Sequence, residues 1–419
     1  MEKYFDIIIV GAGPAGLMAA IEAAHAGAGV LLLEAGPRPG RKLLATGGGR
    51  CNLSHDGTIE SFLAGFERSA SHFLKPAAYA FPPEEAVRFF ESLGVPLKVE
   101  RGARVFPKSD RAGDVLGALL KEAVSSGVIL QTDSPVKSIA GSGSGFEAAA
   151  SRGIYRTGAV ILATGGLSMK RTGSSGDGYA FARKLGHTIV EPRPSLVPLV
   201  TRETWPGELA GLALKNVRLT AILGKKRIQR FGEMLFTHHG ISGPITLEIS
   251  RFLTDSLNSG EGPVVMEIDL KPALDEKKLD ARLLREIQEN PRRRLTAILH
   301  TLMPESLARI YTVHLGFDPE LTAGHVTREE RSRLLRLLKA LPLTVTSTGS
   351  IEEALVTHGG ISLPEIDSHT MESKLCPGLF FAGEIVNTDG DTGGYNLNQC
   401  WATGVLAGRA AANKRVHQG

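Results

Sequence analysis

The hydrophobic pattern near the N-terminus is the clearest in the chain. Residues 7–10 form an unbroken apolar run of the kind found in buried parallel strands, and spaced glycines separate this run from the helix-forming stretch LMAAIEAAH at 17–25. A second apolar run at 30–33 ends in Glu34. This order of strand, glycine turn, helix, strand and acid predicts a dinucleotide-binding βαβ unit.

The spaced glycines have separate expected tasks. Gly11 permits the tight turn, Gly13 lets the backbone approach a pyrophosphate, and Gly16 lets the helix pack against the strand. The pyrophosphate then lies at a helix N-terminus, where unpaired N–H groups and the helix dipole favour negative charge. We expect Glu34 to accept hydrogen bonds from both hydroxyls of an adenosine ribose, which argues against a 2′-phosphate there.

Two later apolar strands also run into glycines. Residues 160–166 read VILATGG, and residues 379–384 read LFFAGE. A Thr-Gly-Gly tripeptide at 392–394 and a helix-like run at 396–411 follow the second of them. Thr-Gly-Gly occurs twice earlier without a regular period, so the chain is not a repeat array. Each copy is a place where backbone can lie against a flat ligand without an intervening side chain.

The positions of these strands favour FAD over NAD. NAD would be bound by two neighbouring nucleotide-binding halves. The ring of FAD, in contrast, is commonly contacted by a strand and a helix from the C-terminal end of a chain. Glu384 is placed to hold a ribityl hydroxyl, and a helix that begins near Gly394 can direct N–H groups at the flavin ring. The alternative for 379–384 is a buried strand with a helix-capping turn.

The segment GRKLLATGGGRCN at 40–52 is the third candidate contact with the cofactor. Arg41 and Lys42 are expected to pair with the pyrophosphate. Residues 47–49 are expected to run beneath the isoalloxazine, because three consecutive glycines cost backbone entropy unless the conformation needs them. A flexible surface loop is the alternative. We interpret Cys51 as a packed small apolar residue rather than a redox thiol.

Changes of pattern divide the rest of the chain. Prolines cluster after Glu191, alternating strand-like segments follow, and amphipathic helices with three- and four-residue apolar spacing come next. The predicted fold class is α/β. We expect an FAD-binding domain at 1–190, an inserted β-rich substrate domain at 191–272, an inserted helical subdomain at 273–342 and the return of the FAD-binding domain at 343–419.

Length and composition limit the number of domains and the class of protein to be expected. A length of 419 residues predicts two or three domains, and 42% hydrophobic with 22% charged residues is typical of a soluble globular protein. Cys51, Cys376 and Cys400 are widely spaced and odd in number, so we expect no disulfide framework, no metal site and a reducing cytoplasm. We expect no leader and no membrane span. The net charge of +4 neither demands nor excludes an RNA partner.

Four longer motifs together resemble one family of bacterial flavoproteins. They are residues 40–52, RVFPKSDRAGDVLGALL at 104–120, LFTHHGISGP at 235–244 and the segment from VTHGGIS to CWATG at 356–404. The family includes aminoacetone oxidases, bile-acid enone reductases and a ribosomal RNA dihydrouridine synthase. The resemblance covers essentially the whole chain. It implies non-covalent FAD, a Rossmann-like two-dinucleotide-binding flavin domain, and an inserted domain with a β-rich and a helical part. It does not choose the substrate.

A flavin reaction of this kind needs one proton supplied or removed near the reacting carbon. The candidates are Cys400, Tyr395, His238, His239 and His358, of which Cys400, Tyr395 and His239 come first. Cys400 lies in the helix expected beside the flavin, and a thiol can protonate the carbon next to the one that receives hydride. Core filling for Cys400 and a structural hydrogen bond for His239 are the alternatives.

Some features have two open interpretations. The basic clusters, residues 225–227 with Arg230 and residues 292–294, indicate either solvated surface or contact with RNA phosphate. Arg104 is expected near the substrate mouth, and a surface ion pair explains it equally well. Residues 141–145, GSGSG, are expected to form a hairpin turn rather than a second dinucleotide fingerprint.

The resulting functional hypothesis is an FAD-dependent oxidoreductase that takes hydride from transiently bound NAD(P)H and reduces an activated carbon–carbon double bond. The acceptor is a small enone or a uracil ring in ribosomal RNA. An amine oxidase of the aminoacetone oxidase type and a non-catalytic flavin-binding scaffold are the alternatives. No stable protein partner is implied. The expected cofactor contacts are Gly11, Gly13, Pro14, Ala15, Gly16, Glu34, Ala35, Arg41, Lys42, Gly47, Gly48, Gly49, Arg50, Asn52, Val136, Ala163, Thr164, Gly165, Gly383, Glu384, Gly394, Tyr395, Asn396 and Leu397.

Overall fold

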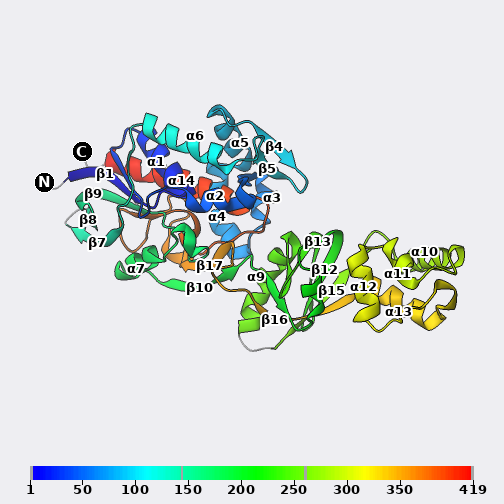
Figure 1. Ribbon diagram of the computed structural model, residues 1–419. Helices are drawn as coiled ribbons and strands as arrows, with labels where there is room; N and C mark the ends of the chain where they lie inside the picture. The colour runs from blue at the N-terminus through cyan, green and yellow to red at the C-terminus, as the bar shows by residue number, and fades with distance from the viewer. Residues whose placement is uncertain (1–2, 143–144, 259–261, 417–419) are drawn as a thin grey trace. The chain divides into compact units, whose positions relative to one another are not determined.

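The chain forms two units in the computed structural model, which describes residues 3–142, 145–258 and 262–416 (Figure 1). The first unit joins Met1–Pro194 with Ala354–Gly419, and the second is Ser195–Glu353. The first is a mixed α/β domain of Rossmann type, and the second is a β-barrel that carries helices. The α/β fold class and the presence of an inserted β-rich and helical part are confirmed.

The first unit contains both ends of the described chain. Its strands are β1 (Lys3–Val10), β2 (Val30–Leu33), β3 (Ser54–His55), β4 (Leu97–Glu100), β5 (Arg104–Pro107), β6 (Ile129–Gln131), β7 (Val136–Ser142), β8 (Gly145–Ala150), β9 (Gly153–Leu162), β10 (Ile189–Ser195), β17 (Val356–Ile361) and β18 (Leu379–Phe381). Its helices are α1 (Pro14–His25), α2 (Arg41–Ala45), α3 (Ile59–Leu63), α4 (Arg68–Ala80), α5 (Pro83–Ser92), α6 (Ala112–Ser125), α7 (Asp177–Lys184) and α14 (Tyr395–Val416), with short 3₁₀ turns at Thr46–Gly49, Lys170–Thr172, Leu363–Glu365 and Gly383–Ile385.

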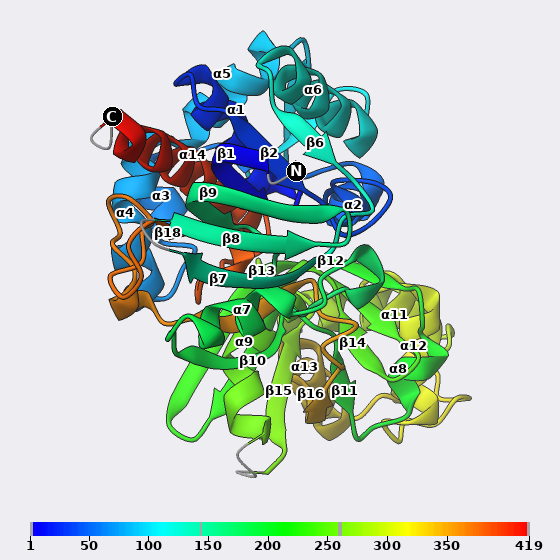
Figure 2. The ribbon, with the colours of Figure 1, turned by 90° about the vertical axis from the view of Figure 1, so that its left-hand side faces the viewer.

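The main sheet has the order β6-β2-β1-β9-β8-β7, with β18 also paired to β9. The strands β6, β2, β1, β9 and β18 are parallel, and β7, β8 and β9 are antiparallel (Figure 2). The antiparallel pairing of β7 with β8 agrees with the hairpin expected at GSGSG, although residues 143–144 of its turn lie outside the described residues. Residues 7–10 and 160–162 are buried in neighbouring strands, so two segments far apart in sequence end at the same edge of the sheet.

Helices α1 and α14 pack tightly against each other and join the two ends of the chain (Figure 1). A Cβ atom added at Gly404 would lie 2.5 Å from the carbonyl oxygen of Ala15, and one added at Gly408 would lie 2.4 Å from that of Ala19. Such distances exclude a side chain, so these two glycines permit the close approach of the helices. This contact places the start of α14 beside the glycine turn that follows β1.

The second unit is built around a closed barrel with the strand order β11-β14-β13-β12-β15-β16. Its strands are β11 (Leu199–Thr201), β12 (Ala213–Leu223), β13 (Lys226–Thr237), β14 (Gly240–Ser242), β15 (Val264–Asp269) and β16 (Leu341–Thr348). Its helices are α8 (Trp205–Glu208), α9 (Pro244–Asn258), α10 (Glu276–Glu289), α11 (Leu295–His300), α12 (Glu305–Val313) and α13 (Arg328–Lys339), with a 3₁₀ turn at Ala323–His325.

The strand at 343–346 belongs to this barrel, which corrects one expected boundary. We expected residues from 343 onward in the returning flavin domain, but β16 pairs with β15 and β11, and the first unit resumes at Ala354. Apolar alternation shows which face of a strand is buried but not which sheet the strand joins, so the sequence pattern could not assign it. The helices α10 to α13 therefore interrupt the barrel between β15 and β16.

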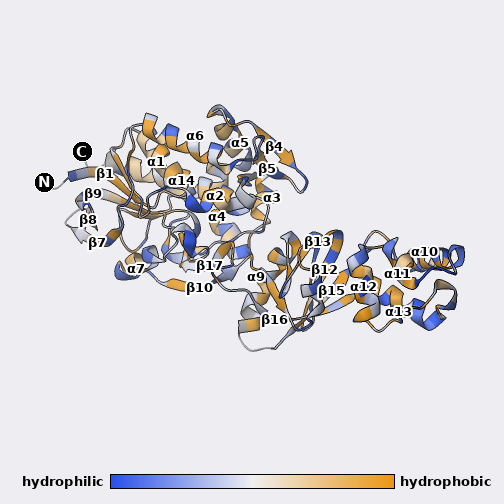
Figure 3. Cartoon of the chain, in the orientation of Figure 1, coloured by the Kyte–Doolittle hydropathy of each residue, from blue (hydrophilic) through white to orange (hydrophobic). Residues whose placement is uncertain are grey.

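The helical part has the amphipathic character that its sequence predicts. Helix α10 buries Leu279 and Leu283, and α13 buries Leu334 and Leu338, while charged residues cover their other faces (Figure 3). Helix α13 begins with a capping box in which the Thr327 hydroxyl and the Glu330 carboxylate each accept a backbone N–H of the other residue. Within the described ranges, no helix has the length and apolarity needed to cross a membrane.

Candidate functional site

The glycine turn between β1 and α1 is shaped by close backbone contacts on two sides and open space on a third. Gly11 has φ +100°, and a Cβ there would lie 2.5 Å from the carbonyl oxygen of Ala163. A Cβ at Gly16 would lie 1.9 Å from the Gly11 carbonyl oxygen. A Cβ at Gly13 would meet nothing within 4 Å. The protein itself therefore requires glycine at 11 and 16, whereas the space above Gly13 at the start of α1 is open to a phosphate group.

Glu34 at the end of β2 is fixed by two backbone donors. Its Oε2 accepts the Ala12 N–H at 3.0 Å, and its Oε1 accepts the Gly36 N–H at 2.9 Å. Each carboxylate oxygen has a second lone pair, so the ribose hydroxyls expected here can still be accepted. The bond to Ala12 joins the Glu34 carboxylate to the glycine turn.

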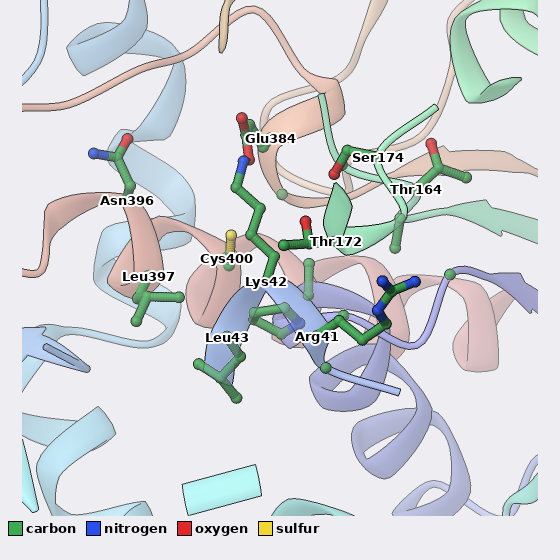
Figure 4. Close-up of a pocket in the computed structure, with 18 of the residues that line it drawn as sticks. Arg41, Lys42, Leu43, Thr164, Thr172, Ser174, Glu384, Asn396, Leu397 and Cys400 are labelled. Atoms are coloured by element: carbon green, nitrogen blue, oxygen red, sulfur yellow. The ribbon is translucent and has the colours of Figure 1, made fainter. Parts of the chain in front are cut away.

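A second polar centre lies around Glu384, which follows β18. The Lys42 ammonium contacts Glu384 Oε2 at 2.5 Å (Figure 4). It also donates to Ser168 Oγ at 2.7 Å, and Ser168 donates to Glu384 Oε1 at 3.0 Å. The Thr357 N–H also donates to Glu384 Oε1, at 2.8 Å. Groups from three other segments of the chain, two side chains and one backbone N–H, therefore meet at the partly buried Glu384 carboxylate.

One cavity of the first unit connects these two centres. It is bordered by Gly11, Gly13, Pro14, Ala15, Glu34, Arg38, Gly40, Arg41, Lys42, Leu43, Thr46, Ala163, Thr164, Gly165, Thr172, Gly173, Ser174, Leu355, Val356, Ala382, Gly383, Glu384, Thr388, Asn396, Leu397, Gln399 and Cys400. Figure 4 shows Thr164 and Ser174 on one side and Asn396 and Leu397 on the other, with Lys42 between them. The cavity is thus built from the glycine turn, the segment at 38–46, the end of β9 and the start of α14.

Two buried polar atoms in this lining lack a hydrogen-bond partner in the described structure. They are Thr164 Oγ1 and Gln399 Oε1. Buried polar atoms are normally satisfied, and unsatisfied ones at a cavity wall indicate a ligand or water position. Together with the open space at Gly13, they fit a long polar coenzyme such as FAD.

Most of the predicted cofactor contacts line this cavity. The residues that do so are Gly11, Gly13, Pro14, Ala15, Glu34, Arg41, Lys42, Ala163, Thr164, Gly165, Gly383, Glu384, Asn396 and Leu397. The sequence interpretation missed Arg38, Leu43, Thr172, Ser174, Thr388 and Gln399, which also line it. Thr172 and Ser174 flank Gly173, and nothing in their residue types indicated which cavity they border.

The remaining predicted contacts lie outside this lining, and a cofactor contact by any of them stays a prediction. Gly16 is used for packing, Ala35 is exposed beside Glu34, and Val136 is buried in β7. The three glycines at 47–49 are exposed, and all have positive φ. A residue with a side chain adopts such a backbone conformation only with strain.

The other four of these contacts, Arg50, Asn52, Gly394 and Tyr395, already have partners within the protein. The Arg50 guanidinium contacts Glu100 at 3.0 Å and Asp110 at 3.4 Å and lies 4.1 Å from the centre of the Phe106 ring. The Asn52 carboxamide, in the orientation that satisfies both of its ends, accepts the Gly394 N–H at 3.1 Å. Tyr395 stacks on His55 with ring centres 4.5 Å apart, and its hydroxyl lies 3.2 Å from His55 Nε2.

The predicted proton donors occupy different environments. Cys400 lines the cavity, and burial, followed by the nearby charge of Glu384, raises the pKa of its thiol to about 12. Cys51 is fully buried, and burial raises the pKa of its thiol to about 12, so its interpretation as a packing residue is confirmed. His238 and His239 lie in the second unit between β13 and β14, where the His239 carbonyl accepts the Thr201 N–H at 3.0 Å. His358 lies on β17 of the first unit.

Several of the basic side chains considered for contact with RNA or substrate already interact with other groups of the protein. Arg227 contacts Glu267 at 2.5 Å, Arg230 contacts Glu248 at 3.2 Å, and Arg294 contacts Glu320 at 2.6 Å. Arg104 donates from Nε to the Arg101 carbonyl at 2.9 Å. Among the described residues, no group of three or more His, Cys, Asp or Glu side chains is arranged to hold a metal ion.

Comparison with known proteins extends over nearly the whole chain. Residues 5–410 match the family model described as HI0933-like protein Rossmann domain. The chain is 33% identical to the 3-dehydro-bile acid delta(4,6)-reductase of Clostridium scindens, with 97% of this chain and 98% of the relative covered. It is 30% identical to the ribosomal RNA dihydrouridine synthase of Haemophilus influenzae, with 96% and 97% covered.

A solved structure is also similar in fold. The 3-ketosteroid-delta4-(5alpha)-dehydrogenase of Rhodococcus jostii RHA1 aligns with a TM-score of 0.53 and 18% identity, covering 98% of this chain and 97% of that one. At this identity the similarity concerns the fold alone.

Proposed function

Because the chain belongs to the HI0933-like Rossmann family of FAD-dependent oxidoreductases, we propose that it reduces an activated carbon–carbon double bond with electrons from NAD(P)H. The observation that carries this proposal is the single cavity that links Glu34 and the glycine turn to Glu384 and Cys400. One coenzyme that contacts both centres must have a nucleotide end and a distant second end, as FAD has. The resemblance of the motifs and the names of the full-length relatives support a reductase.

The residues at the two ends of the cavity have different roles in this proposal. At the nucleotide end, Glu34 accepts the ribose hydroxyls, and the open N-terminus of α1 with Arg41 stabilises the pyrophosphate charge. At the other end, Glu384 orients the ribityl hydroxyls, and the start of α14 directs backbone N–H groups at the ring. When bound there, FAD supplies reversible hydride transfer at its N5 atom.

NAD(P)H must bind only transiently in this proposal. The sequence has a single complete dinucleotide fingerprint, which the coenzyme itself uses. The reductant therefore docks at the same place as the later substrate and leaves before that substrate arrives. This order predicts ping-pong kinetics.

The acceptor is either a small enone or a uracil ring in ribosomal RNA. Both contain a carbon–carbon double bond conjugated to a carbonyl group, so one hydride and one proton complete the same reduction. The relatives named above divide between these two substrate classes. The proposal assigns the enzyme to the reducing cytoplasm, which the three unpaired thiols support.

Anaerobic mixing experiments test the proposal. NADPH should bleach the bound flavin rapidly, and 4-androstene-3,17-dione or a uridine-containing ribosomal RNA fragment should restore its absorbance. Restoration by only one of them identifies the substrate class. Slow bleaching by NADPH together with rapid peroxide release from aminoacetone in air would establish an amine oxidase instead. A protein that binds FAD but exchanges electrons with none of these compounds would be a scaffold.

A further inference from the structure

Gln399 carries a buried amide oxygen in the wall of the cavity. The side chain belongs to α14 and is 2% exposed. Its Nε2 donates to the Thr388 carbonyl oxygen at 3.3 Å and also to the Thr388 hydroxyl. Its Oε1 has no hydrogen-bond partner within the described part of the chain. Gln399 and Thr388 both border the cavity, so this unsatisfied acceptor lies where a ligand can bind.

The partner of Gln399 fixes which end of its amide is left for a ligand. A backbone carbonyl oxygen can only accept a hydrogen bond, so the amide nitrogen must face Thr388 and the amide oxygen must face another group. Side chains in a helix lean toward its N-terminal end, which here is the turn that begins at Tyr395. Gln399 therefore offers an acceptor, and not a donor, near the start of α14.

This part of α14 lies at the Glu384 end of the cavity. The Gly383 N–H donates to the Thr403 hydroxyl at 2.9 Å, and a Cβ added at Gly383 would lie 3.4 Å from Cys400 Sγ. Figure 4 shows Cys400 on the same side of the cavity as Lys42 and Glu384. Gln399 directly precedes Cys400, so its amide oxygen belongs to the end proposed for the flavin ring rather than to the nucleotide end.

The edge of a flavin ring needs an acceptor as well as donors from the protein. The pyrimidine part of the oxidised ring has carbonyl oxygens at C2 and C4 and an N–H at N3 between them. The unpaired N–H groups at the start of α14 suit the two carbonyl oxygens, but they cannot accept the hydrogen of N3. An amide oxygen such as Gln399 Oε1 can only accept, so it complements the helix N-terminus.

Other acceptors in the described lining are already used or lie elsewhere. The Glu384 carboxylate accepts hydrogen bonds from two side chains and one backbone N–H. The Asn396 carboxamide is bonded at both of its ends, accepting the Gly390 N–H and donating to the Gly390 carbonyl oxygen. Thr164 Oγ1 faces Gly178 in α7, where an added Cβ would lie 2.0 Å from it. Of these groups, Gln399 Oε1 is the best match for a ring N–H.

Resting on the proposed function, we infer that Gln399 is a cofactor-binding residue whose Oε1 accepts the N3–H of the flavin ring of FAD. The contact is one neutral hydrogen bond, in which no covalent bond forms or breaks. It holds the pyrimidine end of the ring at the start of α14. It also makes the cavity selective for flavins that are unsubstituted at N3, because an N3-methyl group removes the hydrogen and occupies the position of the amide oxygen.

The test compares FAD with 3-methyl-FAD in titrations followed by flavin fluorescence. The wild type should bind FAD about tenfold or more tightly than 3-methyl-FAD. Gln399→Met keeps the length of the side chain without the amide and should bind FAD about tenfold more weakly than the wild type. Gln399→Ala opens space beside N3 and should lose the preference for FAD. Gln131→Ala is the matched control, since the Gln131 carboxamide is bonded to Ser134 and Tyr155 outside the lining, and it should keep the wild-type preference.

Two results would overturn the inference while leaving the proposed function in place. The first needs no variant and is equal binding of FAD and 3-methyl-FAD by the wild type. The second is a preference for FAD that persists in Gln399→Ala, because other atoms would then exclude the methyl group.

An analogue of FAD that lacks the 2′-hydroxyl of its ribityl chain tests the other partner that Gln399 could have. If the wild type discriminates against this analogue and Gln399→Ala does not, the amide binds the ribityl chain and the inference is wrong. Bound FAD that NADPH cannot bleach would contradict the proposed function, whereas the preference for FAD over 3-methyl-FAD, lost in Gln399→Ala, would still support the role of Gln399.

Discussion

The ammonium of Lys42 and the carboxylate of Glu384 lie 2.5 Å apart, although 342 positions separate them in the chain. The side chains are only 19% and 14% exposed, and Ser168 bonds to both. The pair therefore joins the segment that follows the first βαβ unit to the strand that returns from the C-terminal part. Because both residues also line the cavity, loss of this pair should affect the stability of the fold as well as the shape of the cavity.

Glu384→Gln should destabilise the FAD-free protein, because the partly buried ammonium of Lys42 loses its counter-charge. We expect the free energy of unfolding to fall by about 1–3 kcal/mol, measured by urea denaturation. Glu84→Gln is the matched control, since its partner Arg88 and Glu84 itself are 59% and 73% exposed, and it should cost at most about 0.5 kcal/mol. Equal effects of the two substitutions would show that the Lys42–Glu384 pair adds no stability.

Gly13→Ala should weaken FAD binding without changing the stability of the fold. The backbone at Gly13 has φ −83° and a Cβ there meets no atom within 4 Å, so the FAD-free protein should keep its thermal stability. The added methyl group occupies the space expected for the pyrophosphate, and FAD affinity should fall by about tenfold or more, about 1.4 kcal/mol, in a fluorescence titration.

Gly16→Ala is the comparison for that variant, since its Cβ would lie 1.9 Å from the Gly11 carbonyl oxygen. It should lower the melting temperature of the FAD-free protein as well as FAD binding. Unchanged FAD affinity in Gly13→Ala would show that the phosphate does not bind beside Gly13.

Gly404→Ala should loosen the contact between α1 and α14. The new Cβ would lie 2.5 Å from the Ala15 carbonyl oxygen, and overpacking of this kind costs about 1–3 kcal/mol in the free energy of unfolding. The control is Gly117→Ala, because Gly117 is exposed within α6 and a Cβ there meets no atom within 4 Å. That change should stabilise the protein by about 0.5–1 kcal/mol through helix propensity. A neutral Gly404→Ala would mean that the two helices are not closely packed in solution.

Stability should fall on mild acidification because of His187. Burial lowers the pKa of this imidazole below its ordinary value of 6.5, and its Nε2 contacts Ser373 Oγ at 2.8 Å. The unfolded chain then binds the proton more readily than the folded one, so the contribution is intact above pH 6.5 and is lost as the pH decreases below it. His187→Gln should flatten the pH dependence of the unfolding free energy in this range, whereas His369→Gln should not. Parallel profiles for His187→Gln and wild type would contradict this assignment.

Cys400 should be unreactive as a nucleophile. Burial raises the pKa of its thiol to about 12, so little thiolate is present at pH 8. Iodoacetamide should modify it far more slowly than an unfolded control of the same chain, as followed by peptide mass spectrometry. Cys400→Ala should keep FAD binding, and the rate of its flavin reoxidation decides whether the thiol has any part in proton transfer. A large loss of that rate in Cys400→Ala would favour Cys400 as the proton donor despite its raised pKa.

The local pattern at the N-terminus predicted its structure well. The strand at 7–10, the helix at 17–25 and the separate uses of Gly11 and Gly16 depend on neighbours within a few residues, and the structure has them. Amphipathic spacing likewise predicted α10 and α13, because burial of one helix face leaves a regular mark in the sequence. The long motifs were sufficient to indicate the family.

What sequence alone determined about this protein is therefore its local elements, its type of coenzyme and its family. Only the tertiary structure decided which strand belongs to which sheet, so that residues 343–346 joined the barrel, and which side chains meet at Glu384. Only the folded chain also brought His358 to Asp389. The physical reason is that periodicity and turn chemistry act between near neighbours, whereas ion pairs and cavity walls form between segments whose separation along the chain leaves no pattern in it.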